Sequence, residues 1–184
     1  LPVFVKPARG GSSIVVSKVN SWEEFPAAVD LALEDDEKIL VEPEIVGQEV
    51  EIGVLHYADG TLLASVPALL AGIDDSDEGF YGFDTKYLDN VVTAEIPAPF
   101  APELTEKLRG MAIRAFEAVD GSGLGRCDFF FTPDGRWVVN EINTMPGFTP
   151  ISMYPAMWER TGLSYDDLIS ELLDLALERG VGLH

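Results

Sequence analysis

Two carboxylates, an arginine and an amide recur at alternate positions along two neighbouring apolar stretches. They are Arg126 and Asp128 in the first stretch and Glu141 and Asn143 in the second. Carboxylate and amide oxygens are hard ligands that suit Mg²⁺, which binds one or two carboxylates together with waters and substrate phosphates. If the two stretches bring these side chains together, they predict a divalent-metal site beside a positive charge.

The two stretches, 125–131 and 136–143, are predicted to form an antiparallel hairpin. Both are rich in aromatic and β-branched residues, and Asp134-Gly135 between them is typical of a tight two-residue turn. Such a turn sets the two carboxylates opposite each other and the arginine opposite the asparagine, all on one face. Like charges directly opposite each other are destabilising, so a bound cation would compensate.

Two structural alternatives to the metal site stay open on these four residues alone. The hairpin could be mispaired by one residue, which would move one set of side chains to the other face. Equally, one of the two carboxylates could point into water. The rest of the chain has to decide between these alternatives and a metal.

The composition limits the partners and the compartment. The chain has 184 residues, 47% of them hydrophobic, and a formal net charge of −20. This charge argues against nucleic acid or an anionic membrane as a direct partner, and no apolar run is long enough to span a bilayer. The single Cys127 predicts a small buried residue in an intracellular protein. Leu1 in place of methionine indicates part of a longer protein.

A glycine- and serine-rich turn near the N-terminus could bind phosphate. Residues 7–13 join two strand-like stretches, and Lys6 precedes them. Backbone N–H groups and hydroxyls in such a turn, with a lysine beside them, suit phosphate oxygens. The pattern is not Gly-x-x-x-x-Gly-Lys-Ser/Thr, so an ordinary hairpin turn stays the alternative.

Three glutamates lie in or beside the connection 43–47, namely Glu42, Glu44 and Glu49. Free backbone groups there could read an adenine edge, and a carboxylate could hold ribose hydroxyls. The alternative is that these are plain surface acids.

Residues 69–90 mix acidic and aromatic residues in an irregular pattern typical of a lid loop. They do not form a calcium loop, because Thr85 stands where a bidentate glutamate is required. Lys86 is the only basic residue in this loop and is a candidate for reaching a bound phosphate.

A capping box of Ser21 with Glu24 predicts a helix over 22–33. Apolar residues at helical spacing predict helices over 102–119 and from Ser164 onward. Between the hairpin and the last helix, residues 144–155 are expected to be a loop. Its Pro146-Gly147 turn can point backbone N–H groups toward the hairpin, as the binding of an oxyanion requires.

Five motifs span nearly the whole chain and are, in order, Val5-Lys6-Pro7-Ala8-Arg9-Gly10-Gly11-Ser12-Ser13, Val41-Glu42 with Gly47-Gln48-Glu49, Phe83-Asp84-Thr85-Lys86-Tyr87, Gly125-Arg126-Cys127-Asp128 and Asn140-Glu141-Ile142-Asn143-Thr144-Met145-Pro146-Gly147. Together they resemble the C-terminal part of a bacterial D-alanine–D-alanine ligase, of the ATP-grasp superfamily. Gly10 departs from the family pattern, where many members carry Glu, and Val15 stands where many carry Gly.

The resemblance implies an ATP site. Lys6 is expected to contact the phosphates, and the Gly11-Ser12-Ser13 turn to close over them. Glu42 would bind the adenine amino group, and Glu49 the ribose. The adenine edge would meet the backbone of Glu44 and Ile45.

The resemblance also implies where the metal and the developing charge are held. Asp128, Glu141 and Asn143 would bind two Mg²⁺ ions, with Mn²⁺ as a possible substitute. Arg126 and the N–H of Gly147 would stabilise the tetrahedral adduct.

Substrate contacts follow from the same resemblance. Lys86 would contact the transferring phosphate of ATP, and Ser12 with Tyr87 would orient the first D-alanine. Ser152 and Met153 would hold the carboxylate of the second D-alanine.

The fold implied is an α+β ATP-grasp fold, in which antiparallel sheets with packed helices form two lobes that sandwich ATP. Residues 1–47 would be part of the central lobe, with the phosphate loop and the adenine hinge. Residues 48–184 would be the C-terminal lobe, with a lid at 70–90 and the metal-binding hairpin at 125–143. The N-terminal lobe is missing, so the fragment itself is expected to be inactive.

The implied activity of the parent is the ATP-dependent joining of two D-alanines into D-alanyl-D-alanine through an acyl phosphate, with release of ADP and phosphate. This would be a cytoplasmic step in peptidoglycan precursor synthesis, and hence in cell wall formation and cell shape, by a homodimer acting on small molecules. The alternatives are another ATP-grasp carboxylate–amine ligase, a nucleotide-binding or regulatory module without ligase chemistry, and a purely structural acidic domain.

Overall fold

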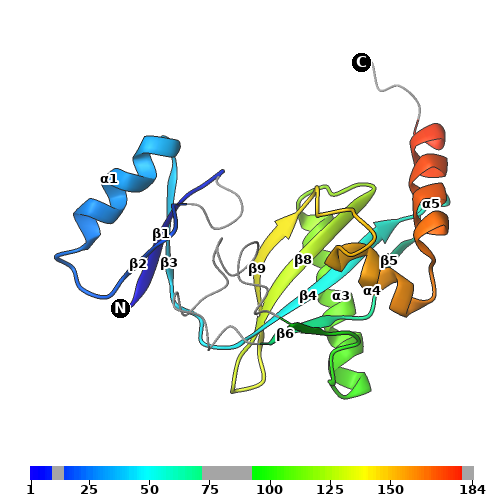
Figure 1. The fold of residues 1–184 in the computed structure, drawn as a ribbon, viewed down its shortest axis with the longest axis horizontal. Coiled ribbons are helices and arrows are strands. Elements are labelled where there is room, and N and C mark those ends of the chain that lie inside the picture. Colours follow the sequence, from blue (N-terminus) through cyan, green and yellow to red (C-terminus); the bar gives the residue numbers. More distant parts are fainter. Residues whose placement is uncertain (10–14, 72–92, 180–184) are drawn as a thin grey trace. The chain divides into compact units, whose positions relative to one another are not determined.

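The computed structural model describes residues 1–9, 15–71 and 93–179 (Figure 1). They divide into two compact units, which we call unit 1 (residues 1–46) and unit 2 (residues 47–70 and 94 onward). The division falls at Val46-Gly47, next to the predicted boundary after residue 47. The functional role of each part as a lobe stays a prediction.

Unit 1 is a three-stranded antiparallel sheet with one helix packed against it. The strands lie in the order β2-β1-β3. Their bounds, with that of the helix, are Val3–Pro7 for β1, Ser17–Val19 for β2, Ile39–Pro43 for β3 and Phe25–Asp35 for α1. Small apolar side chains form its core, namely Val5, Val19, Ala28 and Ala32.

Helix α1 begins three residues later than predicted. The predicted capping box of Ser21 and Glu24 forms only in part: the Glu24 carboxylate accepts the backbone N–H of Asn20 at 2.9 Å and that of Ser21 at 3.4 Å. No side chain caps the helix, and Glu24 itself is its N-cap. Pro26 explains the late start, because proline is tolerated only in the first turn of a helix.

Unit 2 is a six-stranded sheet in the order β7-β6-β4-β8-β9, with β5 paired to β4. The strand bounds are Gln48–His56 for β4, Leu62–Ala64 for β5, Ala68–Ala71 for β6, Thr93–Glu95 for β7, Leu124–Phe131 for β8 and Trp137–Asn143 for β9. The helix bounds are Pro102–Ala118 for α3, Met153–Thr161 for α4 and Tyr165–Glu178 for α5. Strand β6 and helix α4 were not predicted from the sequence.

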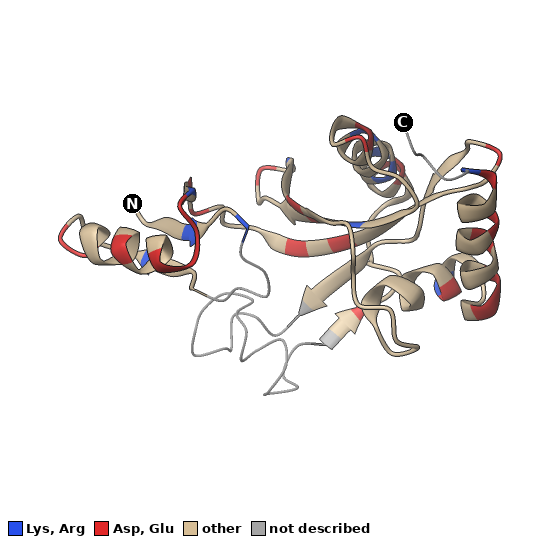
Figure 2. Ribbon diagram, turned by 90° about the horizontal axis from the view of Figure 1, so that it is seen from above, with Lys and Arg blue, Asp and Glu red and all other residues tan. Residues whose placement is uncertain are grey.

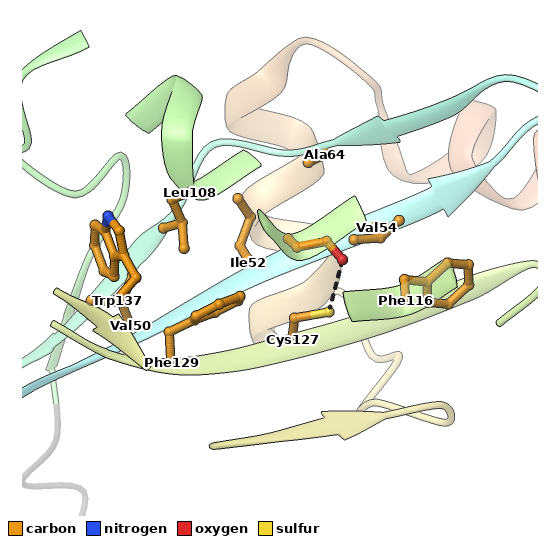
Figure 3. Packing of buried hydrophobic residues seen from close by; sticks show 10 residues of the cluster. Val50, Ile52, Val54, Ala64, Leu108, Phe116, Cys127, Phe129 and Trp137 are labelled. Carbon is orange, nitrogen blue, oxygen red and sulfur yellow. Dashed lines mark hydrogen bonds between the residues drawn. The ribbon is translucent and has the colours of Figure 1, made fainter. Parts of the chain in front are cut away.

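One face of this sheet carries the main core. Alternate residues of β4 and β8 point toward α3, including Ile52, Val54, Cys127 and Phe129 (Figure 3). Cys127 is fully buried, as predicted, and its thiol lies 3.7 Å from the carbonyl oxygen of Ala112 on α3. Helices lie on both faces of the sheet (Figure 2).

The opposite face is covered at one end by α4. Leu55, Tyr154 and Trp158 form a second buried cluster there, and the Tyr154 hydroxyl donates to the carbonyl of Val54 at 2.8 Å. Gly53 makes this contact possible, because a Cβ at this position would lie 2.8 Å from Trp158 Nε1. The other end of the same face carries the charged residues of β4, β8 and β9.

The turn of the β8–β9 hairpin differs from the prediction. Thr132 donates its N–H to the carbonyl of Arg136 and accepts that of Gly135, both at 2.9 Å. Gly135 has a φ of 80°. The loop therefore has three residues, 133–135, and the predicted two-residue Asp-Gly turn is wrong. A type I turn followed by a left-handed glycine is the usual form of such a loop.

A register shift then restores the predicted pairing. Beside the turn, Phe131 faces Trp137 and Phe129 faces Val139, but beyond a shift between Phe129 and Asp128 the partner of Asp128 is Glu141. Asn140 is the extra residue. Without the shift, Glu141 would face the buried Cys127. Trp137 is 7% exposed in the core, so the three-residue turn suits its burial and the shift returns the polar residues to the other face.

None of the helices in the described ranges combines the length and the apolar character that crossing a bilayer needs. Acidic residues mark much of the surface of α1 and α5 (Figure 2).

Candidate functional site

A row of three carboxylates crosses the polar end of the unit 2 sheet. Glu51 on β4 is directly opposite Asp128 on β8, which in turn is opposite Glu141 on β9. In the next row, Arg126 lies between Gly53 and Asn143. The predicted alignment of Asp128 with Glu141 and of Arg126 with Asn143 is confirmed, and mispairing by one residue is excluded.

Arg126 neutralises part of this row. Its Nε and one terminal nitrogen donate to the two carboxylate oxygens of Asp128, both at 2.8 Å. The same Nε lies 3.4 Å from Glu51 Oε2. Burial alone would lower the pKa of Arg126, but the hydrogen bonds with Asp128 and the charges of Asp128, Glu51 and Glu141 raise it overall. The guanidinium is therefore a fixed positive charge at the site.

Asn143 joins the two carboxylates that were predicted to bind metal. Its amide nitrogen donates to Asp128 at 2.9 Å and to Glu141 at 3.2 Å. Rotating this amide by half a turn would present its oxygen to the same point, so that three hard oxygen donors would converge there.

This donor set fits a divalent cation that takes few protein ligands. Within the described ranges, no three acidic, histidine or cysteine side chains are grouped so that they could hold a metal ion. Two carboxylates and an amide would therefore leave the remaining positions to water or phosphate oxygens, which is how Mg²⁺ is usually bound. A metal that needs a complete protein shell does not fit.

Glu51 was missed by the sequence reasoning, although it lies at the centre of the row. The sequence does contain a pattern that indicates it, because Glu49 and Glu51 alternate with valine and isoleucine, which are buried on β4. Glu49 lies two residues along the same strand, opposite Phe130 and on the same face as Glu51. The predicted ribose ligand is therefore brought to the same sheet face as the predicted metal ligands.

In unit 1, two residues predicted to bind different parts of ATP contact each other. Lys6 Nζ lies 2.8 Å from Glu42 Oε2. Glu44 pairs with Lys18 at 2.6 Å, and its backbone N–H donates to the carbonyl of Pro2 at 3.3 Å. The N–H of Glu44 is thus engaged within the protein. Ile45 follows β3 and is partly buried.

A second missed feature is the ion pair of Arg9 and Asp36. The Asp36 carboxylate accepts the Arg9 backbone N–H at 3.0 Å, its Nε at 2.9 Å and a terminal nitrogen at 2.6 Å. It also accepts the N–H of Lys38 at 3.0 Å. The hydrogen bond from the Arg9 side chain is the main reason that the pKa of Asp36 is lowered. Asp36 lies in the acidic run 34–37, so the sequence did not distinguish it from its acidic neighbours.

The loop between β9 and α4 brings Gly147 next to Ser152. A Cβ at Gly147 would lie 3.1 Å from Ser152 Oγ. That oxygen accepts the N–H of Thr149 at 3.0 Å and shares a 2.8 Å hydrogen bond with its hydroxyl. Ser152 is the N-cap of α4, and Met153 is its first residue. The two predicted ligands of the second D-alanine therefore stand at a helix N-terminus.

Several predicted site residues lie outside the described residues. These are Gly11, Ser12, Ser13, Lys86 and Tyr87, together with nearly all of the predicted lid at 70–90. Just after the first of these segments, Val15 has a φ of 60°. This is the left-handed region, which a β-branched residue rarely adopts.

Comparison with known proteins identifies the family. A family model described as "D-ala D-ala ligase C-terminus" matches residues 1–174. The chain is 61% identical to the D-alanine–D-alanine ligase of Corynebacterium efficiens over 179 residues, which is 97% of this chain and 49% of that protein. It is 54% identical to the D-alanine–D-alanine ligase of Mycobacterium bovis over 100% of this chain and 50% of that protein. The chain spans about half the length of these curated relatives.

Solved structures agree with this assignment and with the expected α+β ATP-grasp fold. The D-alanine–D-alanine ligase from Coxiella burnetii matches 96% of this chain and 45% of its own, with a TM-score of 0.80 and 37% identity. The VanG D-Ala:D-Ser ligase from Enterococcus faecalis matches 95% of this chain and 49% of its own, with a TM-score of 0.80 and 34% identity. The chain therefore belongs to the D-alanine–D-alanine ligase family and corresponds to its C-terminal part.

Proposed function

We propose that the longer protein containing this chain joins two D-alanines into D-alanyl-D-alanine, with conversion of ATP to ADP and phosphate. The names of the relatives, at 54–61% identity, support this activity. The observation that carries it is the polar face of the β8–β9 hairpin, where Arg126 donates to Asp128 and Asn143 donates to both Asp128 and Glu141. We place the reaction in the cytoplasm, as a step toward peptidoglycan.

The reaction has two chemical steps. A carboxylate oxygen of the first D-alanine attacks the γ-phosphorus of ATP, ADP leaves, and an acyl phosphate forms. The amine of the second D-alanine then attacks the carbonyl carbon, phosphate leaves, and the nitrogen loses a proton. Arg126 and the Gly147 N–H stabilise the negative charge on the tetrahedral adduct, since fixed donors aimed at a developing oxyanion lower its energy.

Asp128, Glu141 and Asn143 would hold divalent metal at two sites, with Mg²⁺ or Mn²⁺ as the ion. When bound, such ions neutralise the β- and γ-phosphates and make the γ-phosphorus easier to attack. For Asn143 this requires that its amide oxygen replace the nitrogen that now donates to Asp128 and Glu141.

We assign individual contacts with the nucleotide to residues of the family motifs. Lys6, with Gly11, Ser12 and Ser13, contacts the phosphates, so Lys6 has to exchange its 2.8 Å contact with Glu42 for a phosphate oxygen. That exchange frees Glu42 for the adenine amino group. Glu44 and Ile45 meet the adenine edge through their carbonyl side, because the Glu44 N–H is already donated to Pro2. Glu49 holds the ribose.

The amino-acid substrates are assigned to loops. The carboxylate of the second D-alanine binds Ser152 and the start of α4, where no side-chain hydrogen bond caps the helix and a helix N-terminus favours an anion. Met153 lines this position. Ser12 and Tyr87 orient the first D-alanine, and Lys86 contacts the transferring phosphate.

A second candidate function differs only in the attacking amine. The VanG D-Ala:D-Ser ligase matches this chain with the same TM-score, 0.80, as the Coxiella burnetii ligase. D-Serine in place of the second D-alanine is therefore the competing substrate, and a competition assay with both amino acids separates the two functions.

The test uses the full-length protein. Phosphate release from ATP should depend on D-alanine, and D-alanyl-D-alanine should appear in equal amount. Arg126→Ala should lower turnover by roughly 100-fold or more, the usual cost of losing one oxyanion donor, while calorimetry still detects ATP binding.

Glu95→Gln is the matched control, because Glu95 is an exposed acid on β7 of the same sheet. It should leave turnover unchanged. Phosphate release that D-alanine does not stimulate would contradict the proposal, and unchanged turnover in Arg126→Ala would favour a nucleotide-binding module without ligase chemistry.

A further inference from the structure

Glu51 is the most buried side chain in the row of three carboxylates that it forms with Asp128 and Glu141. It is 3% exposed, and it lies directly opposite the like-charged Asp128. A buried carboxylate is costly unless a positive charge or a hydrogen-bond donor faces it, and two opposed carboxylates repel. Arg126 forms ion pairs with both of them. The residue opposite Arg126 on β4 is Gly53, so no side chain lies directly across from it on that strand.

The two contacts of Arg126 are unequal. Its Nε donates to Asp128 at 2.8 Å but lies 3.4 Å from Glu51, which is within reach of an ion pair and too long for a good hydrogen bond. Asp128 therefore holds the guanidinium in this structure. A small rotation of the same Nε–H would bring it onto Glu51.

The proposed metal site competes for Asp128. A divalent cation on Asp128 and Glu141 would repel the guanidinium and take electron density from the oxygens to which it donates. Arg126 is 17% exposed at its side chain, so water alone cannot compensate for the loss of its anionic partner. Another carboxylate has to hold it in place.

We propose that Glu51 is a positioning residue that takes over Arg126 when Asp128 binds a divalent cation. Arg126 would then stay beside the site, with Glu51 neutralising its charge, while Asp128 binds the metal. This inference rests on the proposed function, because it needs the metal at Asp128.

The first measurement is Mn²⁺ binding to the full-length protein in the presence of ADP, with free Mn²⁺ followed by electron paramagnetic resonance. Glu51→Gln should weaken Mn²⁺ binding by roughly 10- to 100-fold, the range typical of a residue that supports a metal ligand. Glu95→Gln removes the same charge from an exposed position of the same sheet and should leave Mn²⁺ binding unchanged.

A double-variant cycle separates positioning from simple charge loss. If Glu51 acts through Arg126, then in an Arg126→Ala background Glu51→Gln should change Mn²⁺ binding less than about twofold. If Glu51 acts on the metal through its own charge, the full 10- to 100-fold loss should persist in that background, and the inference is overturned. Arg126→Gln gives the same comparison if the alanine variant fails to fold, which a melting curve in EDTA shows.

Asp128→Asn distinguishes failure of this inference from failure of the proposed function. Mn²⁺ binding that Asp128→Asn does not weaken would overturn both. Binding that is lost in Asp128→Asn but unchanged in Glu51→Gln would overturn the role of Glu51 alone. Expected are loss in Asp128→Asn, weakening in Glu51→Gln, and no further weakening once Arg126 is removed.

Discussion

The two units keep their sheets folded by different means. The core of unit 1 is made of valines and alanines, including Val5 and Ala32. The main core of unit 2 contains large aromatic side chains, such as Phe116, Phe129 and Trp137 (Figure 3). Because hydrophobic stabilisation scales with buried apolar area, small side chains give unit 1 less of it per residue.

Charged contacts compensate in unit 1. Ion pairs join its first strand to the third through Lys6 and Glu42, and tie the end of the first strand to the residue after α1 through Arg9 and Asp36. The comparison teaches that the stability of unit 1 should respond to charge and backbone geometry, whereas that of unit 2 should respond to side-chain volume. Each prediction below tests one side of this contrast.

The largest effect is expected from Phe129→Ala in unit 2. Phe129 is 1% exposed in the main core, and deleting a buried phenylalanine ring costs about 3–5 kcal/mol of unfolding free energy. Hydrogen exchange should accelerate in β4, β8 and α3 and stay unchanged in β1–β3. Equal acceleration in β1–β3 would show that the two units unfold together and would remove the contrast.

Alkaline pH should also act on unit 2, through Cys127. Burial, and then the charge of Asp128, raise the pKa of this thiol from 9.0 to about 12. Between these values the folded chain holds a proton that the unfolded chain has lost, so stability falls as pH rises. The slope should be about 1.4 kcal/mol per pH unit steeper than in Cys127→Ala, which lacks the thiol.

Urea unfolding at pH 9 to 11 measures this slope. The tyrosines and lysines titrate alike in both chains, so their contribution cancels in the difference. Parallel curves for the two chains would mean that Cys127 is accessible to solvent.

Val15→Gly should stabilise unit 1 by about 1 kcal/mol, because glycine accepts a φ of 60° without the strain that a β-branched residue suffers there. The greater backbone freedom of glycine in the unfolded chain reduces but does not cancel this gain. Slower hydrogen exchange in β1 and β2 would support the prediction. A matched Val19→Gly change, at a buried strand position, should destabilise instead.

The smallest effect is expected for Asp36, whose contribution should disappear in acid. Its pKa is lowered mainly by the hydrogen bond from Arg9, so its contribution is present above the unfolded pKa and is lost as pH falls below it. Arg9 is 73% exposed, and solvent therefore screens the pair. At neutral pH, Asp36→Asn should slightly lower the protection of β1–β3, and added salt should lower it in the parent chain by screening the pair. In strong acid the parent chain loses this contribution as well, so the protection of the two chains should converge.

Sequence reasoning gave the correct alignment of the site through an incorrect turn. The predicted two-residue turn and the observed three-residue turn with one shifted residue both set Asp128 opposite Glu141. Turn chemistry alone could not separate them, because Asp-Gly suits both loops. The burial of Trp137 separates them, and that is a tertiary effect.

Other differences have similar physical causes. Helix α4 was missed because residues 144–155 were expected to be a loop, although proline is acceptable in the first turn of a helix and Tyr154, Met157 and Trp158 have helical spacing. The partners of Arg126 and Asp36 could not be derived, since side-chain hydrogen bonds depend on rotamers that the sequence does not encode locally. The alternation of polar and apolar residues along the strands did reveal which residues share a face. The same pattern on β4 would have identified Glu51.

The shifted residue Asn140 divides the hairpin into two independent halves. A hairpin with a two-residue turn and no bulge would present the same four polar residues as the observed three-residue turn with its bulge, and only the β9 residues near the tip would change face. A change in the length of the turn at residues 132–136 can therefore be offset by the extra residue at position 140, which leaves Asp128 opposite Glu141. An insertion or deletion in the turn of this chain would thus have a place to be absorbed that lies outside the site.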